Sequence, residues 1–282
     1  MRTLMIETSP DVLTQTFFHE GGDKLIVWHH GTPAPRAMSP QMADLFASYG
    51  FSVAIPIRQG YINSTAVGRR SVAEDAKVTA KVVDYFGFDE FRTIGYSGGG
   101  SRAMADLVLN DKCISGITVA PLTPANVPGF DPFAKADETE RAFIAKIQQW
   151  APDLQELLEA DAKAMLAEDP LAAFQNADED TKAWAQTPDA VFRLSQTHLG
   201  LATGVTGWML DEYSLLTDFG FDVKDIKKPL KIITGDKDTL VDMSCSVWLH
   251  EQVKDSELIV LEGMGHSRVF AIDVLDEALA DF

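Results

Sequence analysis

Short apolar runs alternate with helical patterns over the first 120 residues, and this alternation leaves few folds open to the chain. Residues 14–19 alternate polar and apolar side chains like a half-buried strand, and a turn at 21–23 leads into a second strand. Repeated strand–helix units build a mostly parallel sheet with helices on both faces, so we expect an α/β fold. The expected strands here are 14–19, 24–28, 51–55, 91–94 and 114–120, and the expected helices are 39–49, one beginning at 71, and 102–110.

Local signals mark the ends of two of these helices. Ser39 and Pro40 are residues typical of a helix start, and Gly50 is typical of a helix end. Ser71 is followed three residues later by Glu74, which is the spacing of a capping box. We therefore expect Ser71 to cap the helix that follows it.

The alternation is interrupted in the middle of the chain. From about residue 121 to 219 the sequence is rich in Ala, Asp and Glu, shows no clear strand, and indicates helices at 138–150, 152–168 and 180–185. Strands at 230–233 and 258–261, with a helix around 247–253 and another at the end of the chain, restore the earlier pattern. The predicted organisation is a core of residues 1–121 and 220–282, interrupted by a helical cap at 122–219.

Composition excludes several classes of protein. No apolar run approaches the roughly 20 residues of a membrane helix, and the first residues lack the apolar segment of a signal peptide. Two cysteines, Cys113 and Cys245, are too few for a disulfide framework or a zinc site of their own. We therefore expect a cytoplasmic protein with reduced thiols.

The charge balance bears on partners. With 42 acidic and 24 basic residues the net charge is −18, which argues against nucleic acid and anionic membranes as partners. We expect a small-molecule substrate, and the sequence leaves the oligomeric state open between monomer and homodimer.

A serine lies where an expected strand turns into an expected helix. Gly95-Tyr96-Ser97-Gly98-Gly99 matches the pattern G-x-S-x-G, with an expected strand before it and a helix after it. Small neighbours suit a sharp turn that exposes the serine hydroxyl as a nucleophile. We therefore predict Ser97 as a nucleophile.

A serine hydroxyl needs a base to remove its proton, and the base needs an acid to orient it. His266 lies just after the last expected strand, and Asp236 and Asp238 follow the strand before it. The carboxyl ends of parallel strands meet at one edge of the sheet, so these loops should meet there. The chain order Ser, acid, His is that of one known class of triads. No metal or cofactor is expected.

With these motifs the chain resembles the α/β-hydrolase family over nearly all of its length. In that family the acid is the third residue after the glycine in G-x-x-D-x-x-V, which implies Asp238 here and leaves Asp236 as the alternative. Some members carry the acid one strand earlier, but residues 121–126 contain no carboxylate. The remaining histidines, apart from His30, are expected to serve packing or to face solvent: His19, His29, His198 and His250.

The resemblance also implies an oxyanion hole. His30-Gly31-Thr32-Pro33 resembles the family's H-G-x-P loop. Backbone N–H groups stabilise the developing oxyanion, and we expect them from Gly98 and Thr32, because Pro33 has no N–H. His30 is expected to brace the loop.

Two further segments resemble one subgroup of the family. Residues 58–64 resemble R-P-G-Y-G-x-S, and residues 97–101 resemble S-G-G-G-P. The chain departs from these patterns at Ile62-Asn63 and at Ser101, which bears on substrate size. Because residue 97 is serine and not aspartate, epoxide hydrolase and dehalogenase activities are not expected.

The substrate is left open by the sequence. A small or medium ester is the first expectation, and an amide or peptide, as in proline iminopeptidases, is the second, because an acid-rich cap can hold a substrate amine. Perhydrolysis and C–C bond hydrolysis use the same residues, and a non-catalytic binding scaffold is the alternative of another class. Aromatic and apolar residues of the cap are expected to line the pocket: Trp150, Trp184, Trp208 and Met209, with Phe143 and Phe174 as further candidates.

Overall fold

The computed structural model describes residues 1–282, apart from the side chain of Ala173. Its strands are β1 (Arg2–Ser9), β2 (Val12–His19), β3 (Lys24–His29), β4 (Phe51–Pro56), β5 (Phe91–Tyr96), β6 (Cys113–Val119), β7 (Leu230–Gly235) and β8 (Ser256–Leu261). They form one sheet in the order β1-β2-β4-β3-β5-β6-β7-β8. The β1–β2 and β2–β4 pairs are antiparallel, and all the other pairs are parallel.

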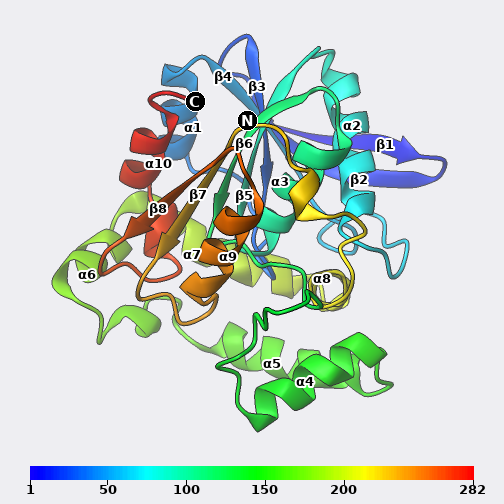
Figure 1. Cartoon of the computed structure of the whole chain (residues 1–282), viewed down its shortest axis with the longest axis vertical. Coiled ribbons are helices and arrows are strands. Elements are labelled where there is room, and N and C mark those ends of the chain that lie inside the picture. Colours follow the sequence, from blue (N-terminus) through cyan, green and yellow to red (C-terminus); the bar gives the residue numbers. More distant parts are fainter.

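Helices cover both faces of this sheet (Figure 1). The α-helices are α1 (Pro40–Ser48), α2 (Ala73–Phe86), α3 (Gly98–Leu109), α4 (Glu138–Gln149), α5 (Leu154–Ala167), α6 (Glu179–Ala185), α7 (Pro188–Ala202), α8 (Thr206–Leu215), α9 (Met243–Gln252) and α10 (Ile272–Leu279). Short 3₁₀ turns are η1 (Ala172–Phe174), η2 (Val223–Asp225) and η3 (Arg268–Phe270). The predicted α/β-hydrolase fold, with a mostly parallel sheet between helices, is confirmed.

Two apolar clusters form the core, one on each face of the sheet. On one face, side chains of α1 and α10 such as Phe46 and Leu275 pack against Trp28 of β3. On the other face, side chains of α2, α3 and α9 such as Val83, Met104 and Leu249 form the second cluster. Strands buried on both sides account for the nearly continuous apolar runs in the sequence.

Helices α4 to α8 follow one another between β6 and β7, and so break the alternation of strands and helices seen from β3 to β6 and from β7 to α10. In Figure 1, α4 and α5 lie at the bottom of the molecule, away from the end where both chain termini are found. Apart from one isolated bridge between Val127 and Phe130, the described backbone between β6 and β7 contains no strand pairing. Among the described helices, none combines the length and apolarity required to cross a membrane.

Several local expectations need correction. The expected helix at 102–110 begins already at Gly98, and β1 and the helices α7 and α8 were not delimited from the sequence. The Ser71 capping box is only half formed: the Glu74 carboxylate accepts the Ser71 N–H at 3.1 Å, but the Ser71 hydroxyl does not cap α2. Instead the N–H of Ala73 donates to the carbonyl of Phe219 at 2.8 Å, so the returning chain satisfies this helix end.

Candidate active site

Ser97 occupies a strained turn between β5 and α3. Its backbone has φ 54° and ψ −125°, a positive φ that is costly for a residue with a side chain. A Cβ atom at Gly95 would lie 2.2 Å from the carbonyl oxygen of Gly99, and one at Gly99 would lie 2.1 Å from that of His29. The glycines are therefore required by close backbone contacts, as expected for a turn that presents the serine.

The loop after β8 brings His266 to the same cavity as Ser97. His266 Nδ1 lies 2.7 Å from Oδ2 of Asp238, which is hydrogen-bonding distance. The other oxygen of Asp238 accepts the N–H groups of Leu240 and Val241, each at 2.9 Å. The Asp238 side chain is fully buried, so this loop fixes the carboxylate and, through it, the imidazole.

Among the described contacts, no hydrogen bond joins the Ser97 hydroxyl to the imidazole ring, although both residues line one cavity. Catalytic hydrogen bonds are often long without substrate and shorten in the complex. Tyr96 holds the histidine loop close to Ser97, because its hydroxyl donates to the carbonyl of His266 at 3.1 Å.

Asp236 points elsewhere. Its Oδ1 accepts the backbone N–H of Gly263 at 2.7 Å, and its Oδ2 lies 3.4 Å from Nζ of Lys237. It therefore ties the loop after β7 to the loop that carries His266. The structure places Asp238 against the imidazole and Asp236 against a backbone amide.

The loop after β3 carries His30 and Thr32 to the cavity. Nδ1 of His30 donates to the carbonyl of Gly31 at 2.8 Å, and its Nε2 accepts the N–H of Arg58 at 3.2 Å. Burial, assisted by the charge of Arg58, lowers the pKa of His30 well below its usual range, so this imidazole is neutral and braces the loop. Gly31, Thr32 and Gly98 line the cavity beside Ser97.

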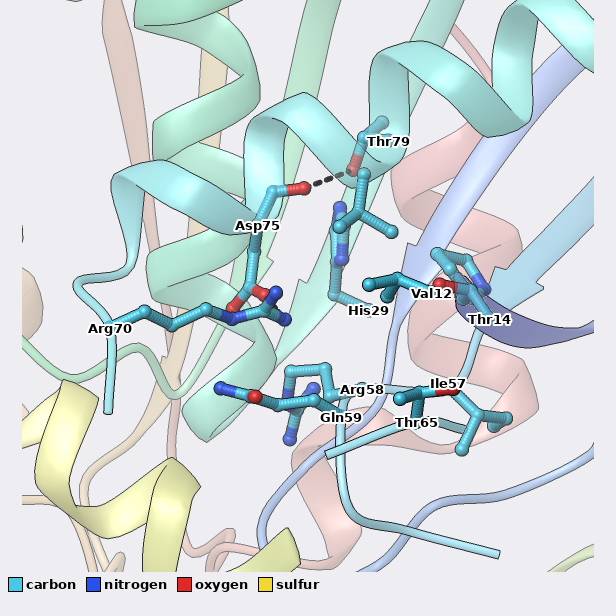
Figure 2. Close-up of a pocket in the computed structure, with 12 residues that line it drawn as sticks. Val12, Thr14, His29, Ile57, Arg58, Gln59, Thr65, Arg70, Asp75 and Thr79 are labelled. Atoms are coloured by element: carbon cyan, nitrogen blue, oxygen red, sulfur yellow. Dashed lines mark hydrogen bonds and ion pairs between the residues drawn. The ribbon is translucent and has the colours of Figure 1, made fainter. Parts of the chain in front are cut away.

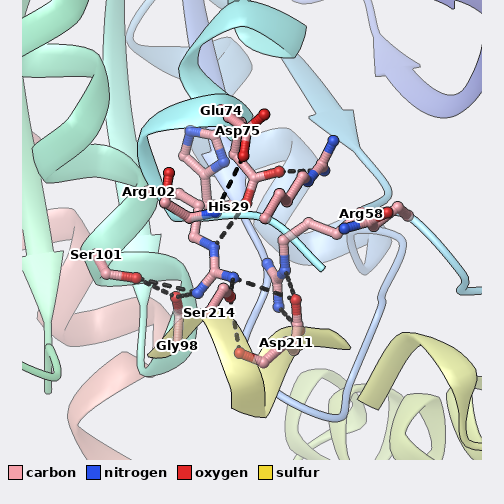
Figure 3. A network of polar contacts seen from close by, with 12 residues as sticks. His29, Arg58, Glu74, Asp75, Gly98, Ser101, Arg102, Asp211 and Ser214 are labelled. Carbon is pink, nitrogen blue, oxygen red and sulfur yellow. Dashed lines mark hydrogen bonds and ion pairs between the residues drawn. The ribbon is translucent and has the colours of Figure 1, made fainter. Parts of the chain in front are cut away.

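A buried ion network links the middle segment to this loop (Figure 3). Asp211 of α8 accepts two hydrogen bonds from Arg58, one from Nε to Oδ1 at 2.7 Å and one from Nη2 to Oδ2 at 2.5 Å. Its Oδ2 also accepts the Thr32 hydroxyl at 2.8 Å. Burial alone would raise the pKa of Asp211, but the charges of Arg58 and Arg102 outweigh it and hold that pKa well below its usual range. Asp211 is therefore an ionised carboxylate that positions Arg58 and Thr32 together.

Arg102 extends the network to the turn at Ser97. Its Nη1 donates to the carbonyl of Gly98 at 2.8 Å, its Nη2 donates to the Ser214 hydroxyl at 2.5 Å, and its Nε donates to Asp75 at 3.0 Å. Figure 3 shows Arg102 between Gly98 and Ser214 of α8. The same set of charges thus contacts the serine turn, the Thr32 loop and α8.

The cavity that contains Ser97 and His266 has a volume of about 830 Å³. Of the four residues predicted to line it, Trp184 and Trp208 do, as does Phe143. Trp150 and Met209 do not, and neither does Phe174. Trp150 packs edge-to-face against Tyr213. Met209 follows Trp208 directly, and one position along an α-helix rotates a side chain by about 100°, so Met209 packs against the core.

A second cavity lies on the far side of Arg58, between β3, α2 and the loop after β4. Figure 2 shows it beside His29, Arg70 and Thr79, and its volume is about 20 Å³. This is close to the space of a single water molecule, so it cannot hold a substrate.

Glu212 is the carboxylate that α8 adds to the large cavity. Its Oε1 accepts the indole N–H of Trp208 at 3.0 Å. Burial raises the pKa of Glu212 to about 7, although the Trp208 hydrogen bond opposes this effect. Near neutral pH the side chain is therefore partly protonated, and its charge is weaker than that of an ordinary glutamate.

Sequence reasoning missed Asp211, Arg102 and Glu212. In a chain with 42 acidic residues, no local pattern distinguishes the two carboxylates of α8 from the others. Arg58 did carry a signal, because it begins the motif at 58–64. It is buried, and a buried guanidinium requires a partner. Its partner lies 153 residues away, however, and no local pattern identifies it.

Comparisons with known proteins agree with the observed fold. The family model described as alpha/beta hydrolase fold matches residues 24–270. A search of curated protein sequences found no match. The solved structures that resemble the chain share only the fold at this level of identity.

Three of these structures illustrate the range of activities on this fold. A bromoperoxidase from Bacillus anthracis is 16% identical, with a TM-score of 0.69 over 99% of this chain and 98% of the other. A malate-bound thermophilic esterase from Thermogutta terrifontis is 18% identical, with a TM-score of 0.66 over 99% and 97%. The epoxide hydrolase VrEH1 from Vigna radiata is 16% identical, with a TM-score of 0.69 over 100% and 96%.

The ion network generates a prediction about stability. In Asp211→Asn the buried guanidinium groups of Arg58 and Arg102 lose a carboxylate, and loss of one partner of a buried pair typically costs about 3–5 kcal/mol. We expect that decrease in the free energy of unfolding by urea. Asp161→Asn, an exposed change on α5, should alter it by less than about 0.5 kcal/mol. Equal effects of the two variants would contradict the role of Asp211.

Proposed function

The chain belongs to the α/β-hydrolase fold family, and we propose that it is a serine hydrolase that cleaves small or medium esters through an acyl-enzyme. The observation that carries the proposal is the 2.7 Å contact of Asp238 with His266 at the cavity that also holds Ser97. A buried carboxylate that orients an imidazole beside a strained serine is the arrangement that acyl transfer requires.

In the proposed mechanism, Ser97 Oγ attacks the ester carbonyl while His266 accepts the hydroxyl proton. Asp238 holds the imidazole in the tautomer whose free nitrogen faces the serine and stabilises the imidazolium that forms. The N–H groups of Thr32 and Gly98 stabilise the oxyanion, and His266 then returns the proton to the leaving alcohol. Water, activated by His266, releases the acid and restores Ser97.

The helical segment is proposed as the lid of this site. Many residues between 122 and 219 line the cavity, among them Phe133, Phe143, Trp184, Trp208 and Glu212. This supports residues 122–219 as the cap and 1–121 with 220–282 as the core. In the proposed arrangement the core supplies the reacting groups and the cap supplies the shape of the pocket.

A second candidate is an amidase or peptidase that holds a substrate amine. Glu212 favours it, because a carboxylate in the cavity could bind an ammonium group. The raised pKa of Glu212, about 7, weakens that partner at neutral pH, and for this reason the ester is preferred. A serine at position 97, and not an aspartate, argues against epoxide hydrolysis, which Vigna radiata VrEH1 carries out on a similar fold.

The substrate class is tested with matched p-nitrophenyl esters and aminoacyl p-nitroanilides. We expect hydrolysis of the esters with kcat/KM at least tenfold above that of the anilides, unchanged after dialysis against EDTA. Faster cleavage of the anilides would favour the peptidase, and no cleavage of either class would favour a binding scaffold.

The two aspartates generate a sharper prediction. Asp238→Asn should lower kcat for an ester by roughly 10⁴, because the imidazole then takes the wrong tautomer. Asp236→Asn is the matched control two residues away, and it should cost about 1 kcal/mol of stability with kcat changed less than threefold, since Asp236 contacts a loop N–H and Lys237 but not the imidazole. Steady-state kinetics and urea unfolding of both variants check this. A dead Asp236→Asn variant beside a nearly normal Asp238→Asn variant would reverse the assignment.

A further inference from the structure

Two buried arginines line the wall of the large cavity beside the proposed nucleophile and base. Arg36 is 8% exposed and Arg193 is 3% exposed, and both belong to the lining that includes Ser97 and His266. Arg36 comes from the loop before α1 and Arg193 from α7, so two distant segments bring positive charge to one place.

Arg36 lacks the partners that a buried guanidinium normally has. Its one hydrogen bond among the described contacts runs from Nε to the carbonyl of Ala34 at a long 3.4 Å. Its guanidinium carbon lies 5.6 Å from the ring centre of Tyr96, the residue before Ser97. No described carboxylate lies within ion-pair distance of Arg36, so its terminal amino groups have no acceptor from the protein.

Arg193 is only partly compensated. Its Nη1 donates to the carbonyl of Phe270 at 2.5 Å and its Nη2 to that of Ser267 at 3.5 Å, while Nε is buried without a partner. The carboxylate of Asp189 lies 3.6 Å from Nη1, and its other oxygen accepts the Ser39 hydroxyl. Asp189 is therefore the one described carboxylate within ion-pair distance of either arginine, and of the two it contacts Arg193 alone.

Two guanidinium groups beside the single carboxylate of Asp189 leave a local excess of positive charge in this part of the cavity wall. Burial, together with the charge of Arg193, lowers the pKa of Arg36 to about 10, which leaves it protonated at neutral pH. A buried unpaired charge is costly, so a ligand anion that pairs with it would relieve that cost. The whole chain has a net charge of −18, so this local excess of positive charge runs against the charge of the rest of the protein.

The place of the pair relates it to the reaction. Arg193 contacts the carbonyl of Ser267, next to His266, and Arg36 lies over Tyr96, next to Ser97. Glu212, the cavity carboxylate described above, contacts Trp208 on α8 and has Asp211 and Arg102 as its charged neighbours. The arginines and Glu212 therefore have separate sets of neighbours within one cavity.

We propose that Arg36 and Arg193 form an anion subsite, and that the preferred substrate is an ester that carries a free carboxylate. Guanidinium groups bind carboxylates in a planar, two-bonded geometry, which also orients the ligand. This inference rests on the proposed ester hydrolysis for its substrate class, but binding of a carboxylate at the subsite can be measured without turnover.

The kinetic test uses two pairs of esters that differ by one charge. Monomethyl glutarate against methyl pentanoate places the carboxylate on the acyl part, and 4-acetoxybutanoate against butyl acetate places it on the alcohol part. By pH-stat, we expect the anionic ester of at least one pair to have a kcat/KM at least tenfold higher than its neutral partner. This ratio should fall at least tenfold in Arg36→Met, and in Arg36→Gln if the first variant does not fold.

Arg69→Met is the matched control. Arg69 also lies over aromatic rings, 5.4 Å from that of Trp150, but it is exposed and outside the cavity lining. The Arg69→Met substitution removes the same charge from the protein and should leave the ratio of kcat/KM between anionic and neutral esters unchanged. A preference absent in the wild type, or equal in Arg36→Met and the wild type, would overturn the subsite.

A binding measurement separates this inference from the proposed function. Glutarate should raise the Tm of Ser97→Ala, which binds without reacting, and should not raise that of the double variant Ser97→Ala/Arg36→Met. If no ester is cleaved but glutarate still shifts the Tm in this way, the subsite stands and the hydrolase proposal fails. If esters are cleaved and glutarate has no effect on Ser97→Ala, the subsite is wrong.

Discussion

The close backbone contacts that the turn after β5 makes within itself and with the end of β3 are the constraint on which the rest of the site depends. Gly95 and Gly99 have no space for a Cβ atom, and Ser97 adopts a positive φ. The turn is therefore held by the strand before it and by the loop after β3, not by its own preference. Because that loop carries Thr32, the position of the serine and the position of the proposed oxyanion donors are set together.

Electrostatics extends this coupling to the helical segment. Asp211 of α8 binds Arg58 and Thr32, and Arg102 binds both α8 and the carbonyl of Gly98. A shift of α8 would thus move charged groups that touch the serine turn and the Thr32 loop at once. The lid proposed here is part of the active-site framework and more than a cover, which is consistent with the cavity being shaped from both parts of the chain.

The core of the fold could be predicted from the sequence because buried parallel strands leave continuous apolar runs and helices leave a 3.6-residue period. The meeting of the loop after β7 with His266 could be predicted because loops after parallel strands share one sheet edge. The choice of Asp238 over Asp236 came from the resemblance to the α/β-hydrolase family. The pocket lining could not: Trp208 and Met209 are neighbours in sequence, yet only Trp208 reaches the cavity. Asp211 and Arg36 were equally out of reach, since what distinguishes each is a partner, or the lack of one, that only tertiary packing decides.

The most direct measurement of the central claim is the site of covalent labelling by a fluorophosphonate, a reagent that reacts with activated serines. Intact-mass analysis should show one adduct per chain, and peptide mapping should place it on Ser97. The adduct should be absent from Ser97→Ala and strongly slowed in His266→Ala, because the base is then missing. An adduct on another residue, or undiminished labelling of Ser97→Ala, would contradict the account.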